Sequence, residues 1–117
     1  MSPEAIALAN VLLDHHNRVC RGSKGTSVTV DSSVVTYGAL CEMAGVKFLA
    51  RSTGPFLQEV AEWCHTNGWP PINSLVINQQ LRRPGDGYDD AAGCSLANWN
   101  AEVHQCIAFK KYPDRAA

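Results

Sequence analysis

The chain has 117 residues, 45% of them hydrophobic, which is long enough for one domain to bury a core without metal or disulfide support. Its formal net charge of −1 excludes a general electrostatic attraction to phosphate backbones or anionic membranes. It contains no apolar run near the roughly 20 residues that span a bilayer, and its first residues lack the basic start of a signal peptide. We therefore expect one cytoplasmic domain over residues 1–117 that makes no membrane contact.

A helix is predicted at the start of the chain. Ser2 is a favourable N-cap residue, and Pro3 suits the first helical position. Apolar residues then recur at helical spacing, which extends the predicted helix to about Cys20. A basic loop follows over residues 21–26, and the alternating residues 27–30 predict a short strand.

Two further helices are predicted in the middle of the chain. The first covers residues 37–44 and is closed by Gly45. The second begins near Thr53 and ends at Gly68, because glycine commonly terminates a helix. Its apolar face has the spacing expected of a core-facing helix. That face consists of Phe56, Leu57, Val60, Ala61 and Cys64.

A two-stranded ribbon is predicted after the second of these helices. Residues 75–77 are strand formers, and residues 78–87 supply a turn and a glycine-rich return. Helix, turn, helix and ribbon in this order are typical of a winged helix. We therefore expect an α+β, winged-helix-like domain with its core at residues 34–88 and an added N-terminal helix.

The end of the chain predicts a packing helix and a tail. Apolar residues from about Leu96 to Phe109 favour a C-terminal helix that packs back onto the core. Residues 112–117 are mostly polar, and chain ends without anchoring contacts are usually poorly ordered. We expect this last segment to fray.

Five cysteines, an odd number without a Cys-x-x-Cys spacing, fit neither a disulfide framework nor a zinc ribbon. We interpret them as reduced thiols, with two of them, Cys41 and Cys64, on buried helix faces. The alternative is a tetrahedral zinc site. Its candidate ligands are Cys64, His65, Cys94, His104 and Cys106. Since their spacing matches no known ligand pattern, we expect no metal ion and no cofactor.

Two short motifs hint at catalysis without establishing it. Asp14-His15-His16 matches the signature of the DHH phosphoesterases, but consecutive helical residues point about 100° apart and no partner motif is present. The glycine-rich residues 22–26 are too closely spaced for a phosphate-binding loop. No nucleophile-elbow pattern is present either. We therefore expect a protein that is not an enzyme.

The middle of the chain resembles a known family of DNA-binding domains. The segments are Val-Thr-Tyr-Gly-Ala-Leu at 35–40, Ala-Gly at 44–45, Ala-Arg-Ser-Thr-Gly at 50–54, and a proline-rich turn and strand ending in Gly-Asp-Gly-Tyr at 85–88. Over about half the chain they resemble the O6-alkylguanine-DNA alkyltransferases and alkyltransferase-like proteins. The resemblance implies that Tyr37 and Arg51 act on the strand of an extruded base, with the arginine filling the gap in the stack.

One departure from that family bears directly on activity. Its reactive Pro-Cys-His-Arg segment would fall near residues 72–76, where this chain has no cysteine. A thiolate is the nucleophile in alkyl transfer, so its absence removes the chemistry. We expect no alkyltransferase activity.

Two functions of different class remain. In the first, the domain binds nucleic acid mainly through the phosphate backbone. The candidate residues are Tyr37, Arg51, Arg82, Arg83 and Lys24. In the second, it is a protein-interaction module, such as a small inhibitor encoded by a phage or mobile element, whose acidic Glu59 and Glu62 face a basic partner. We rank nucleic-acid binding slightly ahead, although Arg82 and Arg83 are equally consistent with ordinary solvated charge at a loop tip.

Overall fold

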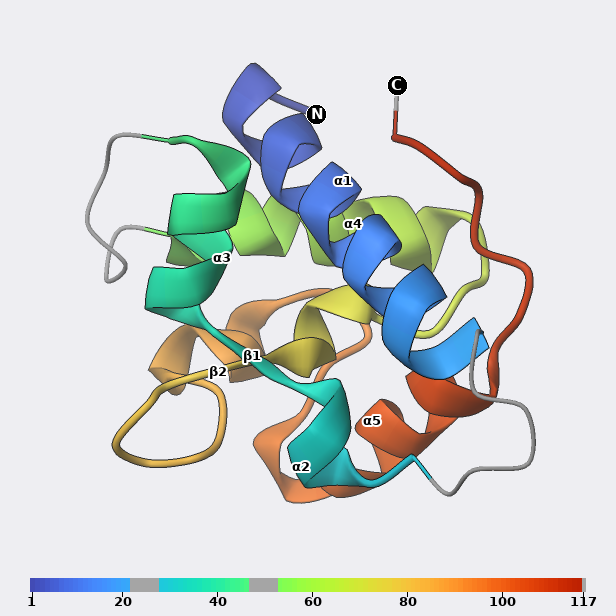
Figure 1. The fold of residues 1–117 in the computed structure, drawn as a ribbon. Helices are drawn as coiled ribbons and strands as arrows, with labels where there is room; N and C mark the ends of the chain where they lie inside the picture. Colours follow the sequence, from blue (N-terminus) through green and yellow to red (C-terminus); the bar gives the residue numbers. More distant parts are fainter. Residues whose placement is uncertain (22–27, 47–52, 117) are drawn as a thin grey trace.

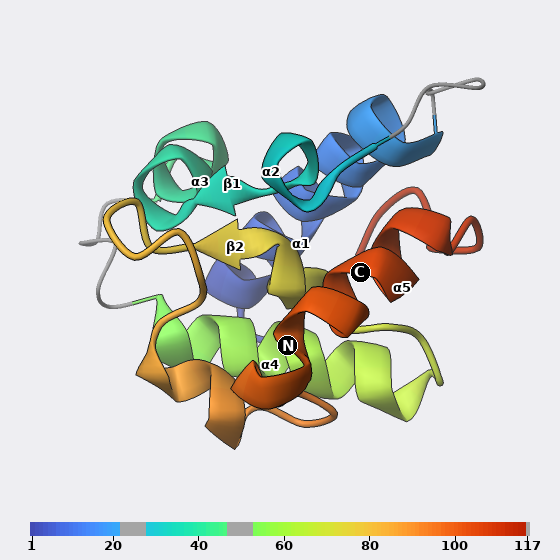
Figure 2. The ribbon, with the colours of Figure 1, turned by 90° about the horizontal axis from the view of Figure 1, so that it is seen from below.

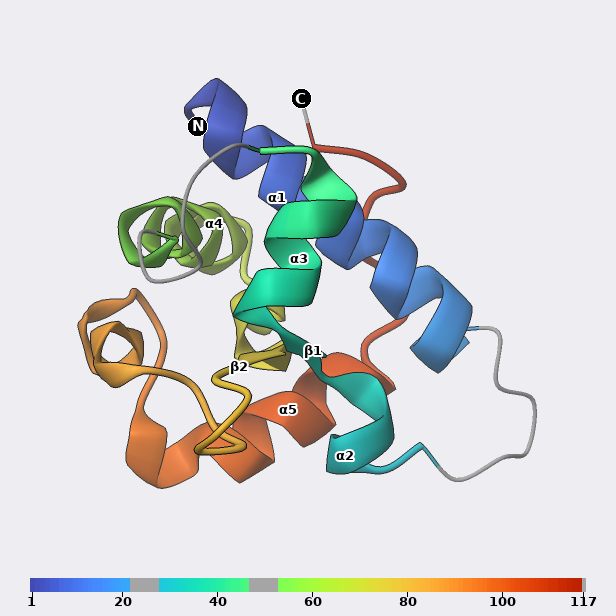
Figure 3. The same ribbon diagram turned by 60° about the vertical axis from the view of Figure 1, so that its left-hand side comes forward.

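Helices account for most of the regular structure in the computed structural model, which describes residues 1–21, 28–46 and 53–116 (Figure 1). The α-helices are α1 (Pro3–His16), α2 (Val30–Ser33), α3 (Tyr37–Ala44), α4 (Gly54–Thr66) and α5 (Trp99–Ala108). The strands are β1 (Val35–Thr36) and β2 (Val76–Ile77), and the shorter helical turns are η1 (Asn17–Arg21), η3 (Ile72–Leu75), η4 (Asp86–Asp90) and η5 (Leu96–Asn98). Both chain ends lie on one side of the molecule (Figures 1 and 3). No helix within the described ranges is long and apolar enough to cross a bilayer.

The N-terminal helix begins where the sequence predicts. The Ser2 side chain accepts a hydrogen bond from the Ala5 amide at 3.2 Å, and Pro3 occupies the first turn. The helix packs against α3 and α4 through an apolar face that includes Leu8 and Leu12, both fully buried. The π-helical turn η1 continues it to Arg21. The predicted helix to about Cys20 is therefore confirmed.

The predicted strand over residues 27–30 is wrong wherever the structure describes it. Thr29 instead caps α2: its side chain accepts from the Ser32 amide at 3.1 Å, and the Ser32 hydroxyl accepts from the Thr29 amide at 3.0 Å. This reciprocal capping box favours a helical turn. Two local hydrogen bonds therefore outweigh the short alternation of apolar residues, while residue 27 lies outside the described ranges.

The two central helices match their predictions closely. Thr36 caps α3 by accepting from the Ala39 amide at 3.1 Å, and Gly45 ends that helix with a left-handed φ of 68°. Helix α4 ends at Thr66, followed by Gly68 with a φ of 72°. Glycine adopts this conformation without the steric cost of a side chain. The predicted apolar face of α4 is buried at Leu57, Val60, Ala61 and Cys64, with Phe56 partly buried.

The sheet differs from the predicted ribbon. Strand β2 pairs in parallel with β1, in the register Val35 with Val76 and Thr36 with Ile77. The strand pair lies between α3 and α4 in Figure 2. Both residues of β2 are buried, as expected for a strand covered on both faces, whereas a wing exposes one face to solvent. After β2, the described residues form a single antiparallel bridge, Asn78 to Arg83, which closes a loop.

The C-terminal segment packs onto the domain instead of fraying. The predicted helix is present as η5 followed by α5. Beyond it, Tyr112 and Ala116 are only 4% and 7% exposed. The Tyr112 hydroxyl donates to the Pro70 carbonyl at 2.5 Å, and the Ala116 amide donates to Asn10 Oδ1 at 2.7 Å. The expectation of a loose tail over residues 112–117 is wrong for residues 112–116, which the buried ring of Tyr112 anchors, while residue 117 lies outside the described ranges.

Candidate nucleic-acid interface

The structure brings three of the five predicted nucleic-acid-binding residues to one end of the molecule. Tyr37 is the first residue of α3, and Arg82 and Arg83 belong to the segment that follows β2. We call residues 78–85 the arginine loop. Figure 3 shows this loop below the start of α3. The other two predicted residues, Lys24 and Arg51, lie outside the described ranges.

The arginine loop is held by hydrogen bonds from a single residue at its base. Asn78 Oδ1 accepts from the amides of Gln80 and Leu81, at 2.9 and 3.0 Å. The backbone of Asn78 accepts from the Arg82 amide at 2.9 Å and donates to the Arg83 carbonyl at 2.8 Å. This is the local turn chemistry expected of asparagine. The loop is therefore a closed structure with a defined tip.

Arg82 has an unusual backbone conformation within this loop. Its φ of 56° lies in the left-handed region, which costs a residue other than glycine about 1–2 kcal/mol. The hydrogen bonds of Asn78 keep the backbone in this conformation despite the cost. A strained conformation at a loop tip is a known feature of binding sites. The backbone of the loop is therefore fixed at Arg82 by the hydrogen bonds of Asn78.

Both arginine side chains of the loop are exposed, and Arg82 forms a weak ion pair with Asp31. Arg82 Nη2 lies 3.7 Å from Asp31 Oδ1, and the two side chains are 53% and 89% exposed. Such exposed ion pairs contribute about 0–1 kcal/mol, so an incoming phosphate can displace the carboxylate at little cost. Arg83 is also exposed. Leu81, beside them, is 54% exposed.

Tyr37 has a structural role at this end of the domain. Its hydroxyl accepts a hydrogen bond from the Gly85 amide at 2.8 Å, which joins the first turn of α3 to the end of the arginine loop. Burial raises the pKa of Tyr37 above its usual value, so the hydroxyl stays protonated at neutral pH. The hydroxyl proton therefore remains available as a donor.

A cavity of about 550 Å³ opens between the start of α3, the start of α4 and the arginine loop. Its wall includes Tyr37, Leu57, Gln58, Asn73, Gln80 and Tyr88. Every side chain in the wall that the structure describes is uncharged. The size is typical of small-molecule sites, which range from about 300 to 1,000 Å³. No pattern in the sequence predicts this cavity.

Asn73 is a buried polar residue of the cavity wall that no sequence pattern indicated as a site residue. It is 4% exposed, and its Oδ1 atom is buried without a hydrogen-bond partner among the described residues. An unsatisfied buried acceptor costs about 1–3 kcal/mol. The available signal was an amide within the run of residues 72–77, which is apolar apart from Asn73 and Ser74. A buried polar atom that lacks a hydrogen-bond partner is more informative than a buried apolar side chain.

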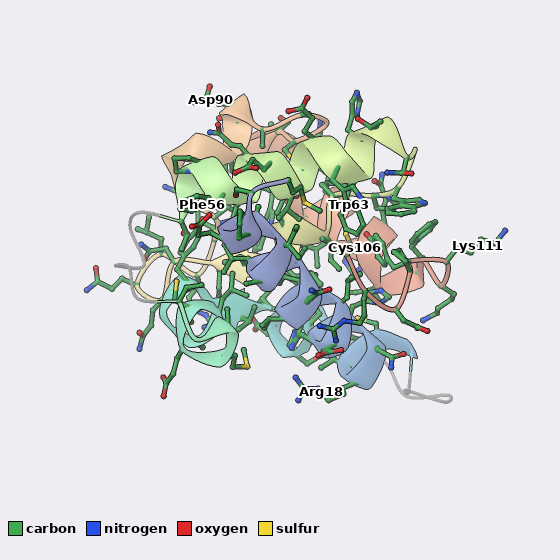
Figure 4. The ribbon with its side chains drawn as sticks, turned by 90° about the horizontal axis from the view of Figure 1, so that it is seen from above. Arg18, Phe56, Trp63, Asp90, Cys106 and Lys111 are labelled. Carbon is green, nitrogen blue, oxygen red and sulfur yellow. The ribbon has the colours of Figure 1, made fainter. Side chains whose placement is uncertain are left out.

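The cysteines and histidines of the alternative zinc site do not form a metal-binding cluster in the part of the chain that the structure describes. Cys64 and Cys106 are buried, whereas His65 and His104 are exposed. Among the described residues, no three His, Cys, Asp or Glu side chains are placed to hold a metal ion. Burial raises the pKa of Cys64 to about 12 and that of Cys106 to about 11. Both thiols are therefore protonated at neutral pH, and Figure 4 shows Cys106 in the interior.

The residues of the Asp-His-His motif point in different directions. The Nε2 atom of His15 donates to the Ser33 carbonyl and that of His16 to the Cys106 carbonyl, each at 2.7 Å. Asp14 is exposed. The two imidazoles thus link α1 to α2 and to α5. Within the described residues, they form hydrogen bonds that hold helices together.

Glu59 and Glu62, the acidic residues expected to face a protein partner, differ in their contacts. Glu59 accepts hydrogen bonds from the Ser2 amide at 2.7 Å and from the Ser2 hydroxyl at 2.8 Å. These two bonds lower the pKa of Glu59. Its carboxylate therefore fastens the start of α1 to α4. Glu62 is exposed on the same helix.

No protein-family model matches the chain, and neither the curated proteins nor the solved structures include a match to it. The functional proposal therefore depends on the residues themselves.

Proposed function

We propose that this domain is a non-catalytic module that binds nucleic acid, mainly through the phosphate backbone. Arg82 and Arg83 make the phosphate contacts, and Tyr37 lies beside them. The observation that carries the proposal is the hydrogen bond from the Gly85 amide to the Tyr37 hydroxyl. It holds the arginine loop against α3, so that residues far apart in the sequence form one surface.

The charge of this surface sets the expected strength of binding. The chain has 10 lysine and arginine residues against 11 acidic ones, so affinity has to come from a local cluster and not from overall charge. The described side chains at loop positions 78–85 include two arginines and no acid. Two phosphate contacts give modest affinity that falls steeply as salt increases.

The order of elements supports a relationship to winged-helix proteins. Two helices, α3 and α4, precede β2, and the arginine loop follows it. We propose that this loop takes the place of a wing as the backbone-contacting element. Arg51, which precedes α4, would then add a third cation.

The protein-partner alternative has less support from the described contacts. It depends on an acidic face at Glu59 and Glu62, but the Glu59 carboxylate already accepts two hydrogen bonds from Ser2. Only Glu62 remains as an exposed acid of that pair. A single carboxylate supplies little electrostatic complementarity to a basic partner.

A titration of labelled oligonucleotides at low salt tests the proposal. Fluorescence anisotropy should report binding of single-stranded or double-stranded DNA by the native chain, and weaker binding by the Arg82→Ala, Arg83→Ala double variant. Lys111→Ala is a matched control, since Lys111 is an exposed cation that projects from the end of the molecule remote from the arginine loop (Figure 4). The proposal fails if the native chain binds neither form of DNA.

A further inference from the structure

We propose that the cavity between α3, α4 and the arginine loop binds a neutral sugar. The cavity measures about 550 Å³, which lies within the range of small-molecule sites, about 300–1,000 Å³. One water molecule occupies only roughly 30 Å³ in the liquid, so the space suits a molecule of many linked atoms. The site goes beyond nucleic-acid binding, since Arg82 and Arg83 are not among the described residues of its wall.

The wall of this cavity is rich in side chains that form hydrogen bonds. Fifteen described residues line it, and four of them are glycines. Of the other eleven, nine carry a hydroxyl or an amide, and only Leu57 and Ala91 are aliphatic. Most small-molecule sites have the opposite composition, with mainly hydrophobic and aromatic walls and a few polar groups. An apolar ligand would leave the polar groups of this wall without partners, whereas a ligand dense in hydroxyls provides them.

Four residues of the wall carry a side-chain amide and are not buried. They are Gln58 on α4 and Asn78, Gln79 and Gln80 of the arginine loop. No hydrogen bond joins the side chain of Gln79 or Gln80 to another described residue. An amide both donates and accepts hydrogen bonds, so one amide can pair with two neighbouring hydroxyls of a sugar ring. These four residues are the polar partners that we assign to the ligand.

Two other polar residues of the wall are occupied by contacts within the protein. The Tyr88 hydroxyl donates to Glu102, and Asn73 Nδ2 donates to Cys94 Sγ at 3.5 Å. Tyr88 and Asn73 are both buried, so neither polar group is assigned to the ligand. Tyr37 and Tyr88 are the aromatic residues of the wall. Because the face of an aromatic ring is electronegative, such residues suit the C–H groups of a sugar ring.

The charge of the wall selects a sugar without an ionised group. Every side chain that the structure describes in the wall is uncharged. A carboxylate or an ammonium group that loses water on entry would find no opposite charge among these side chains, and burial of an unpaired charge is costly. Hydroxyl groups meet both donors and acceptors there.

Two hydrogen bonds join the walls of the cavity before any ligand arrives. Tyr37 on α3 accepts from the Gly85 amide at 2.8 Å, and Gln58 Nε2 on α4 donates to the Gly87 carbonyl at 3.4 Å. Both helices are thereby tied to the segment around residues 85–87. A preformed cavity reduces the ordering cost of binding.

Chemical-shift titration of the isotope-labelled full chain tests the proposal without DNA. The probes are glucose, galactose, mannose and xylose, and at least one should shift the side-chain amide signals of Gln79 and Gln80. The uronic acid or the amino sugar of the same configuration, charged at about pH 7, should bind at least about tenfold more weakly. Nicotinamide, a flat neutral ring without hydroxyls, should also bind more weakly than the sugar. The proposal is overturned if none of the four sugars shifts these signals, if the charged forms bind as tightly, or if nicotinamide binds more tightly.

The Gln79→Ala, Gln80→Ala double variant distinguishes ligand contacts from structural ones. It removes two side-chain amides but keeps the backbone amide of Gln80, which donates to Asn78. The melting temperature should therefore stay the same, while sugar affinity, followed through the Gln58 side-chain signal, should fall about tenfold. Gln105→Ala, at an exposed position of α5 outside the described wall, is the matched control and should keep the native affinity. Unchanged sugar affinity in the folded double variant would refute the role of these amides.

A second variant tests the location of the sugar independently of the arginine loop. Gly38 lines the cavity, and a Cβ built there meets nothing within 4 Å. Gly38→Leu should therefore obstruct the cavity and weaken binding while the fold remains. Met43→Ala, at an exposed position of the same helix outside the described wall, is the control and should bind the sugar normally. Equal sugar affinity in the Gly38 and Met43 variants would contradict the proposed location.

Discussion

The Tyr37 hydroxyl and the Gly85 amide, 48 residues apart in the chain, form a hydrogen bond of 2.8 Å. This bond joins the first turn of α3 to the end of the arginine loop, and both residues also line the cavity. The proposed phosphate-binding surface and the cavity therefore share this one contact. Changes at Tyr37 should affect both.

The Tyr37→Phe variant should loosen the arginine loop. The ring is kept, but the Gly85 amide loses its acceptor, and the loss of one such bond reduces stability by about 0.5–1.5 kcal/mol. Hydrogen exchange measured by NMR should show faster exchange of the Gly85 amide, with helix α5 protected as before. Unaltered protection of Gly85 would mean that the bond does not hold the loop.

The contact between Glu59 and Ser2 should make stability depend on pH. The folded state lowers the pKa of Glu59 below its ordinary value of 4.5, so the ionised carboxylate stabilises the fold above that pH and this contribution is lost as pH falls through the folded pKa. Urea unfolding should show Glu59→Gln to be less stable than the native chain at about pH 7, with a smaller difference at about pH 3. Glu62→Gln, on the exposed side of α4, is the matched control. A difference between native and Glu59→Gln that is independent of pH would contradict the role of the ionised carboxylate.

Removal of the C-terminal segment should destabilise the domain. Truncation after Lys111 deletes the buried ring of Tyr112, and loss of a buried aromatic side chain typically costs about 3–5 kcal/mol. A thermal melt should show a clear fall in Tm, whereas Arg115→Ala, at an exposed position in the same segment, should melt like the native chain. Equal melting of the truncated and native chains would show that the segment is frayed after all.

The core of α4 should not tolerate a charge. Val60 is fully buried, and Val60→Asp places an unpaired carboxylate among apolar side chains. Circular dichroism should show an unfolded chain at room temperature. Glu62→Asp, two residues along on the exposed face, should remain folded. A native-like melt for Val60→Asp would mean that the assigned buried face is wrong.

Local signals in the sequence explain which parts of the fold were predictable. Helix α3 has a threonine cap and a glycine stop within nine residues of each other, and α4 has a continuous apolar face, so both were predicted with nearly the observed bounds. The alternation of residues 27–30 predicts a strand in place of α2. The capping box of Thr29 and Ser32 instead favours the helical turn that forms. Capping chemistry was the stronger local signal.

Long-range contacts explain what the sequence could not predict. The parallel pairing of Val35 with Val76 joins segments 41 residues apart, and nothing local specifies it. The cavity likewise requires α3, α4 and the arginine loop to be placed together. Of the proposed site, the identities of Tyr37, Arg82 and Arg83 came from the sequence, whereas the hydrogen bond that joins Tyr37 to the end of the arginine loop emerged only from the structure.

The salt dependence of DNA affinity is the most direct test of nucleic-acid binding through Arg82 and Arg83. Anisotropy titrations with duplex DNA at several salt concentrations give the slope of log affinity against log salt, and each phosphate contact contributes about 0.9 to its magnitude. The Arg82→Ala, Arg83→Ala variant should therefore reduce the slope by about 1.8 relative to the native chain and to Lys111→Ala. Asp31→Asn should strengthen binding, since it removes the carboxylate that lies 3.7 Å from Arg82. A double arginine variant with the native affinity and slope, or a native chain that binds no DNA at low salt, would contradict the account.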